Sequence, residues 1–247
     1  MHLDFREAWP RLKRLVPPQY RPRLRRNALR VIAPFCRSNL KLLATLADTD
    51  KWNYHWYVQH YETHFHSIRN HKLNLLEIGI GGYDNPTLGG ESLRMWKAYF
   101  PSAQIYGLDI EDKSSHAERR IKVFQGSQVD EELIKTISSS AGGFDIVVDD
   151  GSHRNEHVIR TFQILFPLLR VPGIYVIEDT QTSYWPSYGG GDRSERTAMG
   201  FLKSLVDGLN YREFSADSYQ PSYFDRHIVS VHFYHNLVFV YKGLNND

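Results

Sequence analysis

The spacing of apolar and polar residues along the chain changes near residue 73. Beyond that point, short apolar runs of strand length alternate with longer segments in which apolar residues recur every three to four positions. The runs predict strands at 75–78, 104–108, 121–124, 144–148 and 173–177, and the longer segments predict helices at 92–100, 131–138, 158–169 and 195–209. Strands that alternate with helices are typical of a parallel sheet covered by helices on both faces.

Two further β-rich runs follow, at 228–233 and 237–241. Tyr234, His235 and Asn236 join them, which indicates a β-hairpin. The whole pattern predicts an α/β fold, a Rossmann-like sheet with helices on both faces and a C-terminal antiparallel hairpin.

The first 48 residues have a different character, and we interpret 1–48 as a basic helical N-terminal arm and 49–247 as the main domain. Between Arg11 and Lys41 there are ten Lys or Arg and no Asp or Glu, although the net charge of the chain is only +2. Such a segment can contact an anionic membrane surface or nucleic acid. The alternative is a solvated helical arm that packs on a neighbouring subunit.

Aromatic residues are dense between Trp52 and Phe65. Their helical spacing forms two stripes, one of Trp56, His60 and His64 and one of Tyr57, Tyr61 and Phe65. Stripes of this kind usually belong to a core or an interface. The functional alternative is a lid from which Asp50, His55 and Tyr57 reach a cofactor pocket.

Glycines follow the first predicted strand at Gly79, Gly81 and Gly82. A strand, a glycine loop and a helix in this order place a nucleotide-like ligand at the carboxyl end of the strand. The dinucleotide fingerprint G-x-G-x-x-G is absent because position 84 is Asp84. The stretch from Glu77 instead resembles the acidic-x-G-x-G motif of class I S-adenosylmethionine (SAM) methyltransferases.

Polar residues also follow the second and third strands. Asp109 ends the second strand, where a carboxylate can accept both hydroxyls of a ribose or can cap the next helix. The loop 124–130 offers amide and hydroxyl groups, among them Ser127 and Gln128. In the class I methyltransferases, the corresponding loop lies against adenine.

Acidic residues follow the fourth and fifth strands, which we expect to be neighbours. Asp150 comes after the fourth strand, and Glu178 and Asp179 come after the fifth. These three carboxylates suit Mg²⁺ or Mn²⁺, and His153 is placed to act as a general base. The alternative is a turn with helix capping and a hydrogen-bonded surface histidine.

The order of the motifs GIGGY, SLRMWK, GLDIEDKS, FQGSQVD, DDGSH and IEDTQTSYW resembles the macrocin/mycinamicin-type sugar O-methyltransferase family. The likeness covers about residues 49–190. It implies a class I methyltransferase sheet, SAM and Mg²⁺ (or Mn²⁺) as cofactors, and methylation of hydroxyls on deoxysugars. The chain is shorter than family members that carry a large N-terminal domain.

The resemblance also implies residue roles. The metal ligands would be Asp150, Glu178 and Asp179, and the catalytic residues His153 and Asp150. The SAM site would comprise Glu77, Gly79, Gly81, Ser92, Asp109, Ser127, Gln128, Asp130 and Asp149. Substrate contacts are expected from Tyr184, Trp185 and Tyr57, and the loop Gly189-Gly190-Gly191 is a possible lid hinge.

The predicted function is therefore Mg²⁺-dependent SAM O-methylation of a sugar hydroxyl on a glycosylated natural product or glycolipid, with His153 as the base. A cephalosporin-pathway type of methyltransferase with a non-sugar acceptor is one alternative, and a non-catalytic membrane or nucleic-acid interaction protein is another. We expect a small-molecule glycoside as substrate, a homo-oligomer, membrane contact through the basic arm and no nucleic-acid partner.

The setting is predicted to be cytoplasmic. Cys36 is the only cysteine, so the chain has neither a disulfide framework nor a thiolate metal cluster. No apolar run approaches the ~18 residues that indicate a membrane-spanning helix. The first residues, with Asp4, Glu7 and Pro10, do not resemble a secretory signal.

Overall fold

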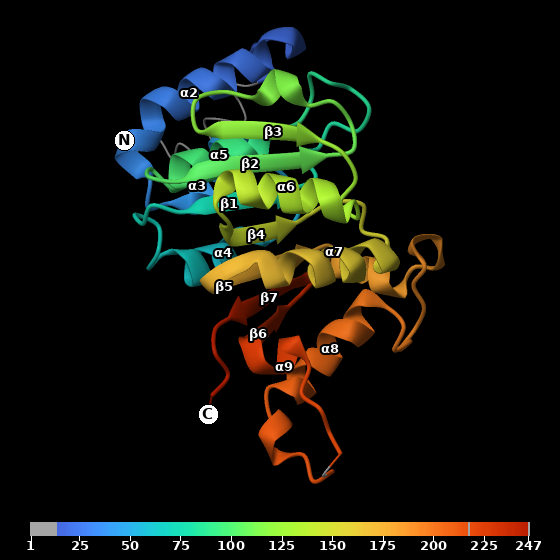
Figure 1. Cartoon of the computed structure of the whole chain (residues 1–247). Helices are drawn as coiled ribbons and strands as arrows, with labels where there is room; N and C mark the ends of the chain where they lie inside the picture. The colour runs from blue at the N-terminus through green and yellow to red at the C-terminus, as the bar shows by residue number, and fades with distance from the viewer. Residues whose placement is uncertain (1–13, 217, 247) are drawn as a thin grey trace.

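The computed structural model describes residues 14–216 and 218–246. These residues form one seven-stranded sheet with the order β3-β2-β1-β4-β5-β7-β6 (Figure 1). The strands are β1 (Asn74–Ile78), β2 (Gln104–Asp109), β3 (Ile121–Gln125), β4 (Phe144–Asp149), β5 (Leu169–Glu178), β6 (Ile228–Tyr234) and β7 (Leu237–Lys242). β1 to β5 pair in parallel, whereas β7 is antiparallel to both β5 and β6. The predicted α/β sheet with its C-terminal antiparallel hairpin is confirmed.

Helices cover both faces of this sheet. They are α2 (Arg21–Cys36), α3 (Leu40–Ala47), α4 (Val58–Phe65), α5 (Glu91–Tyr99), α6 (Glu131–Ala141), α7 (Asn155–Leu168), α8 (Ala198–Gly208) and α9 (Tyr223–His227). Short 3-10 helices lie in the connections: η1 (Pro18–Tyr20), η2 (Ser114–His116), η3 (Thr180–Tyr184), η4 (Pro186–Tyr188) and η5 (Tyr211–Glu213). In the part of the chain that the structure describes, no helix is long and apolar enough to cross a membrane.

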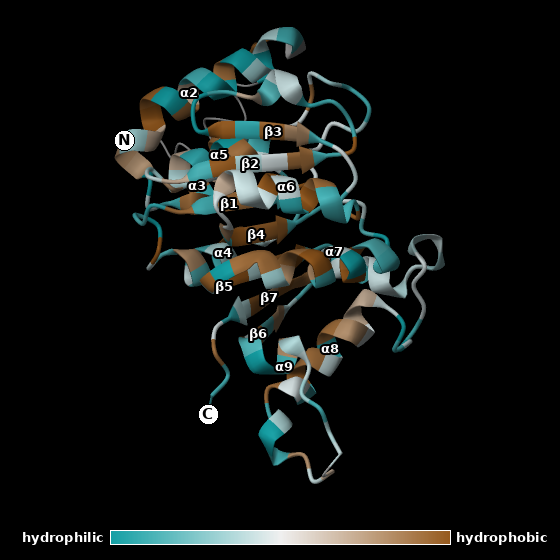
Figure 2. Ribbon diagram, viewed as in Figure 1, coloured by the Kyte–Doolittle hydropathy of each residue, from teal (hydrophilic) through white to brown (hydrophobic). Residues whose placement is uncertain are grey.

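Alternate residues along each strand point to opposite faces and supply two separate cores. Leu75 and Ile105 belong to the core under α2, α3, α4 and α5. Leu76 and Leu108 belong to the core on the other face, with apolar residues of α6, α7 and α8. Because the central strands are buried on both sides, they are hydrophobic along nearly their whole length, as the brown strands of Figure 2 show.

The described part of the basic segment consists mainly of α2 and α3, which pack on the sheet layer. Leu29 and Ala33 of α2 and Leu43 of α3 are buried in the same core as Trp96 of α5. α2 lies along the β3 side of the molecule in Figure 1. The division into an arm (1–48) and a domain (49–247) stays a prediction, and residues 1–13 of that arm lie outside the described residues.

The aromatic segment contributes mainly to the core. Tyr57, Tyr61 and Phe65 are buried, and Tyr61 and Phe65 each lie within 6 Å of the Trp96 ring centroid. In the other stripe, Trp56 is 57% exposed. The core interpretation therefore holds for the stripe of Tyr57, Tyr61 and Phe65.

Helix ends differ from the predicted ones where side chains cap them. α8 begins after Thr197, whose hydroxyl accepts a hydrogen bond from the amide of Gly200. The five-residue helix α9 was not predicted, because it is too short to show a hydrophobic period. It depends on a capping box, in which Ser222 and Asp225 each accept a hydrogen bond from the other's backbone amide.

His64 of α4 lies between two tyrosines of the hairpin. Its Nδ1 is 2.7 Å from the Tyr241 hydroxyl and its Nε2 is 2.9 Å from the Tyr234 hydroxyl. Burial, with a smaller contribution from nearby histidines, lowers the pKa of His64 to about 4. The unfolded chain takes up a proton at an ordinary histidine pKa of about 6.5. We therefore expect the free energy of unfolding to fall as the pH drops from about 6.5 to about 4.

Urea denaturation at several pH values in this range measures the effect. The His64→Leu variant is expected to show a smaller fall in the free energy of unfolding than the wild type. His66→Leu, an exposed position at the end of the same helix, is the control and should keep the wild-type dependence. An unchanged slope in His64→Leu would contradict the account of a buried neutral histidine.

Candidate functional site

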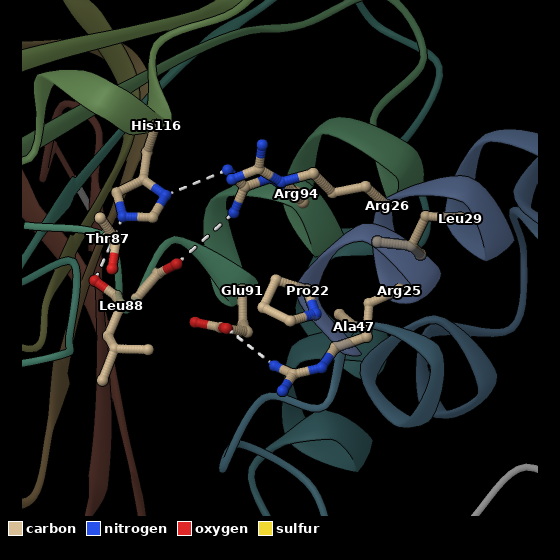
Figure 3. Close-up of a pocket in the computed structure, with 11 residues that line it drawn as sticks. Pro22, Arg25, Arg26, Leu29, Ala47, Thr87, Leu88, Glu91, Arg94 and His116 are labelled. Atoms are coloured by element: carbon tan, nitrogen blue, oxygen red, sulfur yellow. Dashed lines mark hydrogen bonds and ion pairs between the residues drawn. The ribbon is translucent and has the colours of Figure 1, made fainter. Parts of the chain in front are cut away.

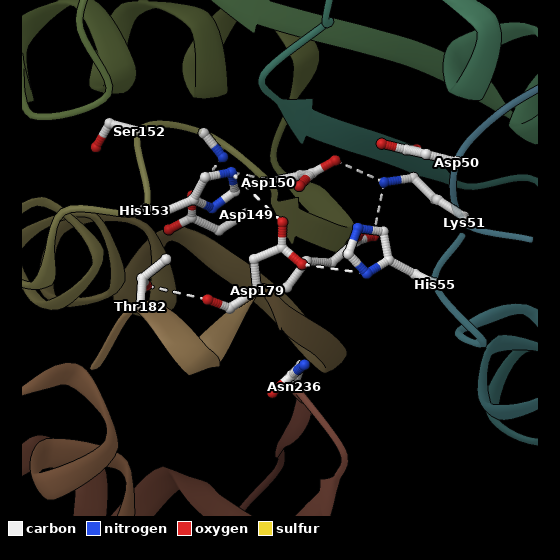
Figure 4. Close-up of polar contacts among 12 residues, drawn as sticks. Asp50, Lys51, His55, Asp149, Asp150, Ser152, His153, Asp179, Thr182 and Asn236 are labelled. Carbon is white, nitrogen blue, oxygen red and sulfur yellow. Dashed lines mark hydrogen bonds and ion pairs between the residues drawn. The ribbon is translucent and has the colours of Figure 1, made fainter. Parts of the chain in front are cut away.

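Polar side chains converge where β4 and β5 end. The two strands are parallel neighbours, and Asp149 pairs with Ile177, which places Asp150 level with Glu178. His153 Nε2 lies 3.9 Å from Asp150 Oδ1 and 3.8 Å from Asp179 Oδ2 (Figure 4). One potential ligand atom from each of Asp150, His153 and Asp179 falls within 4.8 Å of the others. Ligands held at 2.0–2.6 Å from one cation lie up to about 5 Å apart, so this spacing fits a divalent ion.

The backbone is strained at two of these three residues. His153 has a φ of 56° and Asp179 a φ of 52°, both in the left-handed region. Side chains other than glycine adopt this region rarely, and such strain concentrates at functional sites. The local geometry turns both side chains toward the same mouth, as Figure 4 shows.

The aromatic segment supports Asp179. The Tyr57 hydroxyl donates a hydrogen bond of 2.6 Å to Asp179 Oδ1, and His55 Nδ1 lies 3.7 Å from the same oxygen. Burial alone would raise the pKa of Asp179, but the Tyr57 hydrogen bond and the neighbouring histidines outweigh it and lower that pKa. Asp179 is thus held ionised, as a cation ligand must be.

Lys51 lies at the centre of a buried acidic cluster and was not predicted as a site residue. Its Nζ is 2.7 Å from Asp150 Oδ2, 2.7 Å from Glu178 Oε1 and 3.2 Å from Glu77 Oε1. The lysine is fully buried. Burial by itself lowers the pKa of Lys51, but the three carboxylates outweigh it, and the pKa lies well above its usual value. Lys51 therefore supplies a fixed positive charge beneath the site.

Glu178 lies deeper than Asp150 and Asp179. It is 3% exposed, and its Oε1 accepts hydrogen bonds from Lys51 and from the Tyr61 hydroxyl. Burial and the charge of Asp150 raise the pKa of Glu178 well above its usual value. Glu178 stands beside the three converging residues rather than among them, and its role as a metal ligand stays a prediction.

A buried amide fixes the loop that carries Asp150 and His153. Gln128 Oε1 accepts a 2.7 Å hydrogen bond from the Ser152 amide, while its Nε2 donates to Asp149 Oδ1 and to Thr161 Oγ1. Asp149 also accepts from the Tyr175 hydroxyl and the Gly151 amide, and burial raises the pKa of Asp149 to about 7. Gln128 and Asp149 thus position the loop, and their predicted contacts with SAM stay predictions.

The glycine loop borders the acidic cluster. A Cβ on Gly79 would lie 2.1 Å from the Asp150 carbonyl oxygen, so glycine is required where these loops meet. A Cβ on Gly81 would meet nothing closer than 3.8 Å, which leaves open space beside the loop. Glu77, near the end of β1, is fully buried, and its Oε1 lies 3.2 Å from Lys51 Nζ. The open space beside Gly81 leaves room for a ligand, and the roles of Glu77, Gly79 and Gly81 in a SAM site stay predictions.

The remaining predicted cofactor residues make local contacts. Asp109 accepts hydrogen bonds from the amides of Ile80 and Glu111, which ties the end of β2 to the glycine loop. Asp130 caps α6 and Ser127 accepts from the Val129 amide. Ser92 lies in the first turn of α5, just after the glycine loop. Their cofactor roles stay predictions.

The predicted substrate residues separate into two groups. Tyr184 and Trp185, at the end of η3, are 45% and 47% exposed. Tyr57 is only 2% exposed, and its hydroxyl donates a hydrogen bond to Asp179. Tyr184 and Trp185 thus remain free to meet a ligand, whereas Tyr57 supports the acidic site from below. The hinge role of the loop 189–191 stays a prediction.

The sequence is similar to those of known O-methyltransferases. Residues 92–203 match the family model described as rhamnosyl O-methyltransferase/CmcI. Demethylmacrocin O-methyltransferase of Streptomyces fradiae is 50% identical over 204 residues, which are 81% of this chain and 52% of that protein. Mycinamicin VI 2''-O-methyltransferase of Micromonospora griseorubida is 49% identical over 216 residues, 85% of this chain and 54% of that protein.

A solved methyltransferase structure has the same fold as this chain. The MycE methyltransferase from the mycinamycin biosynthetic pathway, in complex with Mg and SAH, superposes with a TM-score of 0.82 at 48% identity. The match covers 85% of this chain and 54% of that one. The chain thus spans about half the length of the curated relatives it matches, and over that half the predicted methyltransferase fold is confirmed.

Proposed function

Because this chain is related in sequence and fold to the macrocin/mycinamicin-type sugar O-methyltransferases, we propose that it is a Mg²⁺-dependent SAM O-methyltransferase. Its acceptor is a hydroxyl of a sugar, such as a deoxysugar, on a glycosylated natural product or glycolipid. The observation that carries the proposal is the convergence of Asp150, His153 and Asp179 at the ends of β4 and β5. The solved relative MycE was crystallised with Mg and SAH, which supports both cofactors.

Asp150 and Asp179, with Glu178 beside them, would hold the cation. An all-carboxylate set suits Mg²⁺ and accepts Mn²⁺, and it leaves positions free for acceptor oxygens. The bound metal would supply a Lewis acid that lowers the pKa of the acceptor hydroxyl. Lys51 neutralises part of the carboxylate charge from the buried side, while Tyr57 keeps Asp179 in place.

The residues at the end of β1 would bind SAM, which supplies the methyl group. Glu77 lies near the end of β1, paired with Lys51, and the space beside Gly81 is open. Asp109 holds the glycine loop in shape through its bond to Ile80. This contact would help to orient a bound cofactor toward Asp150, and orientation is the protein's main contribution to the transfer.

His153 would remove the proton from the acceptor hydroxyl. Its side chain is 23% exposed and points into the mouth between Asp150 and Asp179. The exposed rings of Tyr184 and Trp185 would contact a face of the sugar. A homo-oligomer, membrane contact through the basic arm and a cytoplasmic setting stay predictions.

The His153→Asn variant is expected to lose about a hundredfold in turnover, because a positioned base contributes roughly 10²–10⁴-fold. Asparagine tolerates the left-handed backbone of this position, so the loop should keep its shape. The variant should still bind Mn²⁺, which separates a base from a metal ligand. The control His55→Gln changes the other histidine near Asp179. A wild-type pH–rate profile in His153→Asn, or loss of Mn²⁺ binding, would contradict the base role.

A panel of glycosides and their aglycones tests the function directly. The protein is incubated with SAM and Mg²⁺, and products are examined by mass spectrometry for one added methyl group. Methylation of glycosides alone is expected. Methylation of aglycones would favour the non-sugar acceptor of a cephalosporin-pathway enzyme, and no methylation across the panel would favour a non-catalytic interaction protein.

A further inference from the structure

A strongly basic cavity lies between α2 and α5. It has a volume of about 400 Å³ and is lined by six arginines and Lys97, with Glu118 as the one carboxylate among its described lining residues. Glu118 forms an ion pair with Lys97, since its Oε1 lies 2.7 Å from Lys97 Nζ, so it does not neutralise the arginines. The cavity therefore carries a large uncompensated positive charge.

Four of the arginines have no partner in the described structure. Arg23, Arg26, Arg30 and Arg37 make neither an ion pair nor a hydrogen bond with any residue in 14–216 or 218–246. They come from the segment whose ten cations are not interrupted by an acidic residue. Gathering like charges around one cavity raises the free energy of the fold unless an anion occupies it.

Arg94 adds a buried positive charge with an unpaired hydrogen-bond donor to this cavity. It is 9% exposed, and its Nε has no hydrogen-bond partner among the described residues. Figure 3 shows its guanidinium beside that of Arg26 and next to His116. Burial and the charge of Arg26 lower the pKa of Arg94. A buried guanidinium with an unused donor is suited to a phosphate oxygen.

This cavity is separate from the candidate catalytic site. Pro101, just beyond α5, and Arg120, just before β3, line it. Both residues lie at the amino ends of the parallel strands, whereas Asp150 and Asp179 follow the carboxyl ends of β4 and β5. An occupant of the cavity would therefore not touch the groups proposed to transfer the methyl.

We propose that the cavity between α2 and α5 binds the phosphate or diphosphate group of a small anion. Its volume lies within the roughly 300–1,000 Å³ of small-molecule sites. Leu29, Ala33 and Ala98 line the same cavity and can contact an organic group attached to the phosphate. The described lining contains no aromatic ring, which disfavours single-stranded nucleic acid because its bases bind by stacking. The proposal does not depend on the proposed methyl transfer.

Inorganic pyrophosphate is the probe, titrated into the full chain by calorimetry in the presence of EDTA. The chelator prevents metal-bridged binding at the acidic site. We expect one site in the wild type, and roughly tenfold or greater weakening in Arg26→Gln/Arg30→Gln, since charge-assisted hydrogen bonds are lost. Lys72→Gln/Lys203→Gln removes the same charge from two exposed positions elsewhere and should bind as the wild type does. Equal weakening of both double variants, or no binding to the wild type, would overturn the proposal.

The phosphate can come from a soluble metabolite or a lipid headgroup, and vesicles distinguish the two. Val31 and Phe35 of α2 are 68% and 89% exposed, so they can enter a bilayer beside the cavity. Sedimentation is compared for phosphatidylcholine vesicles with and without phosphatidic acid. Binding that requires phosphatidic acid and is lost in both Arg26→Gln/Arg30→Gln and Val31→Ser/Phe35→Ser assigns the lipid source. Pyrophosphate binding without vesicle binding assigns a soluble one.

Discussion

Replacing Asp150 with asparagine is expected to lower methyl transfer by about 10²–10³-fold, which is the scale of losing one electrostatic contact to the transition state. Asp150 contacts the two groups on which the site depends, since Oδ1 faces His153 and Oδ2 pairs with Lys51. Asparagine keeps the shape but removes the charge that a divalent cation requires. Turnover is measured with SAM and a methylated glycoside as product, and binding of S-adenosylhomocysteine is measured by calorimetry.

The Asp150→Asn variant should still bind S-adenosylhomocysteine, because Asp150 is not among the predicted cofactor residues. Asp145→Asn is the matched control. It changes an aspartate at the opposite end of the same strand, where Asp145 pairs with Arg170. This control should retain turnover. Wild-type turnover in Asp150→Asn would contradict the metal role, and loss of cofactor binding would reassign Asp150 to holding the glycine loop.

Replacing Lys51 with methionine is expected to reduce the free energy of unfolding by about 3–5 kcal/mol, the usual cost of removing one partner of a buried ion pair. The substitution leaves Glu77, Asp150 and Glu178 close together without a counter-charge. Urea denaturation measures the loss. Lys72→Met, at an exposed position, should change stability by no more than about 0.5 kcal/mol.

The deficit of Lys51→Met should depend on pH with a definite sign. Without Lys51, the pKa values of these carboxyl groups in the folded state move further above their unfolded values. Stability is then lost as the pH rises through the unfolded carboxyl pKa of about 4 and beyond. The deficit should therefore be larger at about pH 8 than at about pH 5. A deficit that is absent, or that grows toward low pH, would show that Lys51 does not neutralise the cluster.

The fold could be predicted from the sequence because its strands and helices differ in the spacing of their apolar residues. Leu75 and Leu76 illustrate the reason: both are buried, one on each face, so β1 has adjacent apolar residues, and glycines follow the strand. The short helix α9 was missed because its stability comes from the Ser222–Asp225 capping box rather than from an apolar stripe.

The convergence of Asp150 and Asp179 was also predictable. Each follows an apolar strand directly, and the carboxyl ends of parallel neighbours meet at one edge of the sheet. His153 followed from its position three residues after Asp150. These assignments needed only the strand ends and the type of side chain.

Lys51 and Gln128 could not be assigned from the sequence. Lys51 is 99 residues from Asp150 and 127 from Glu178, and it lies in an irregular turn with no periodic signal. A cation at the edge of an aromatic segment was the local hint. The predicted contact of Gln128 with SAM stays a prediction, but its positioning role was missed, because its buried amide holds Ser152 and Thr161, partners that only tertiary structure brings together. Hydrogen bonds between side chains that are far apart in the sequence leave no regular spacing pattern that could predict them.

The central claim is a divalent-metal site next to a SAM site, and Mn²⁺ electron paramagnetic resonance tests it most directly. Spectra are recorded with S-adenosylhomocysteine present, for the wild type and for Asp150→Asn. The account predicts that wild-type protein removes Mn²⁺ from the free signal and that Asp150→Asn does so much more weakly. Equal binding by both proteins, or no binding by either, would contradict a metal site at Asp150 and leave a metal-free methyltransferase in which His153 acts alone.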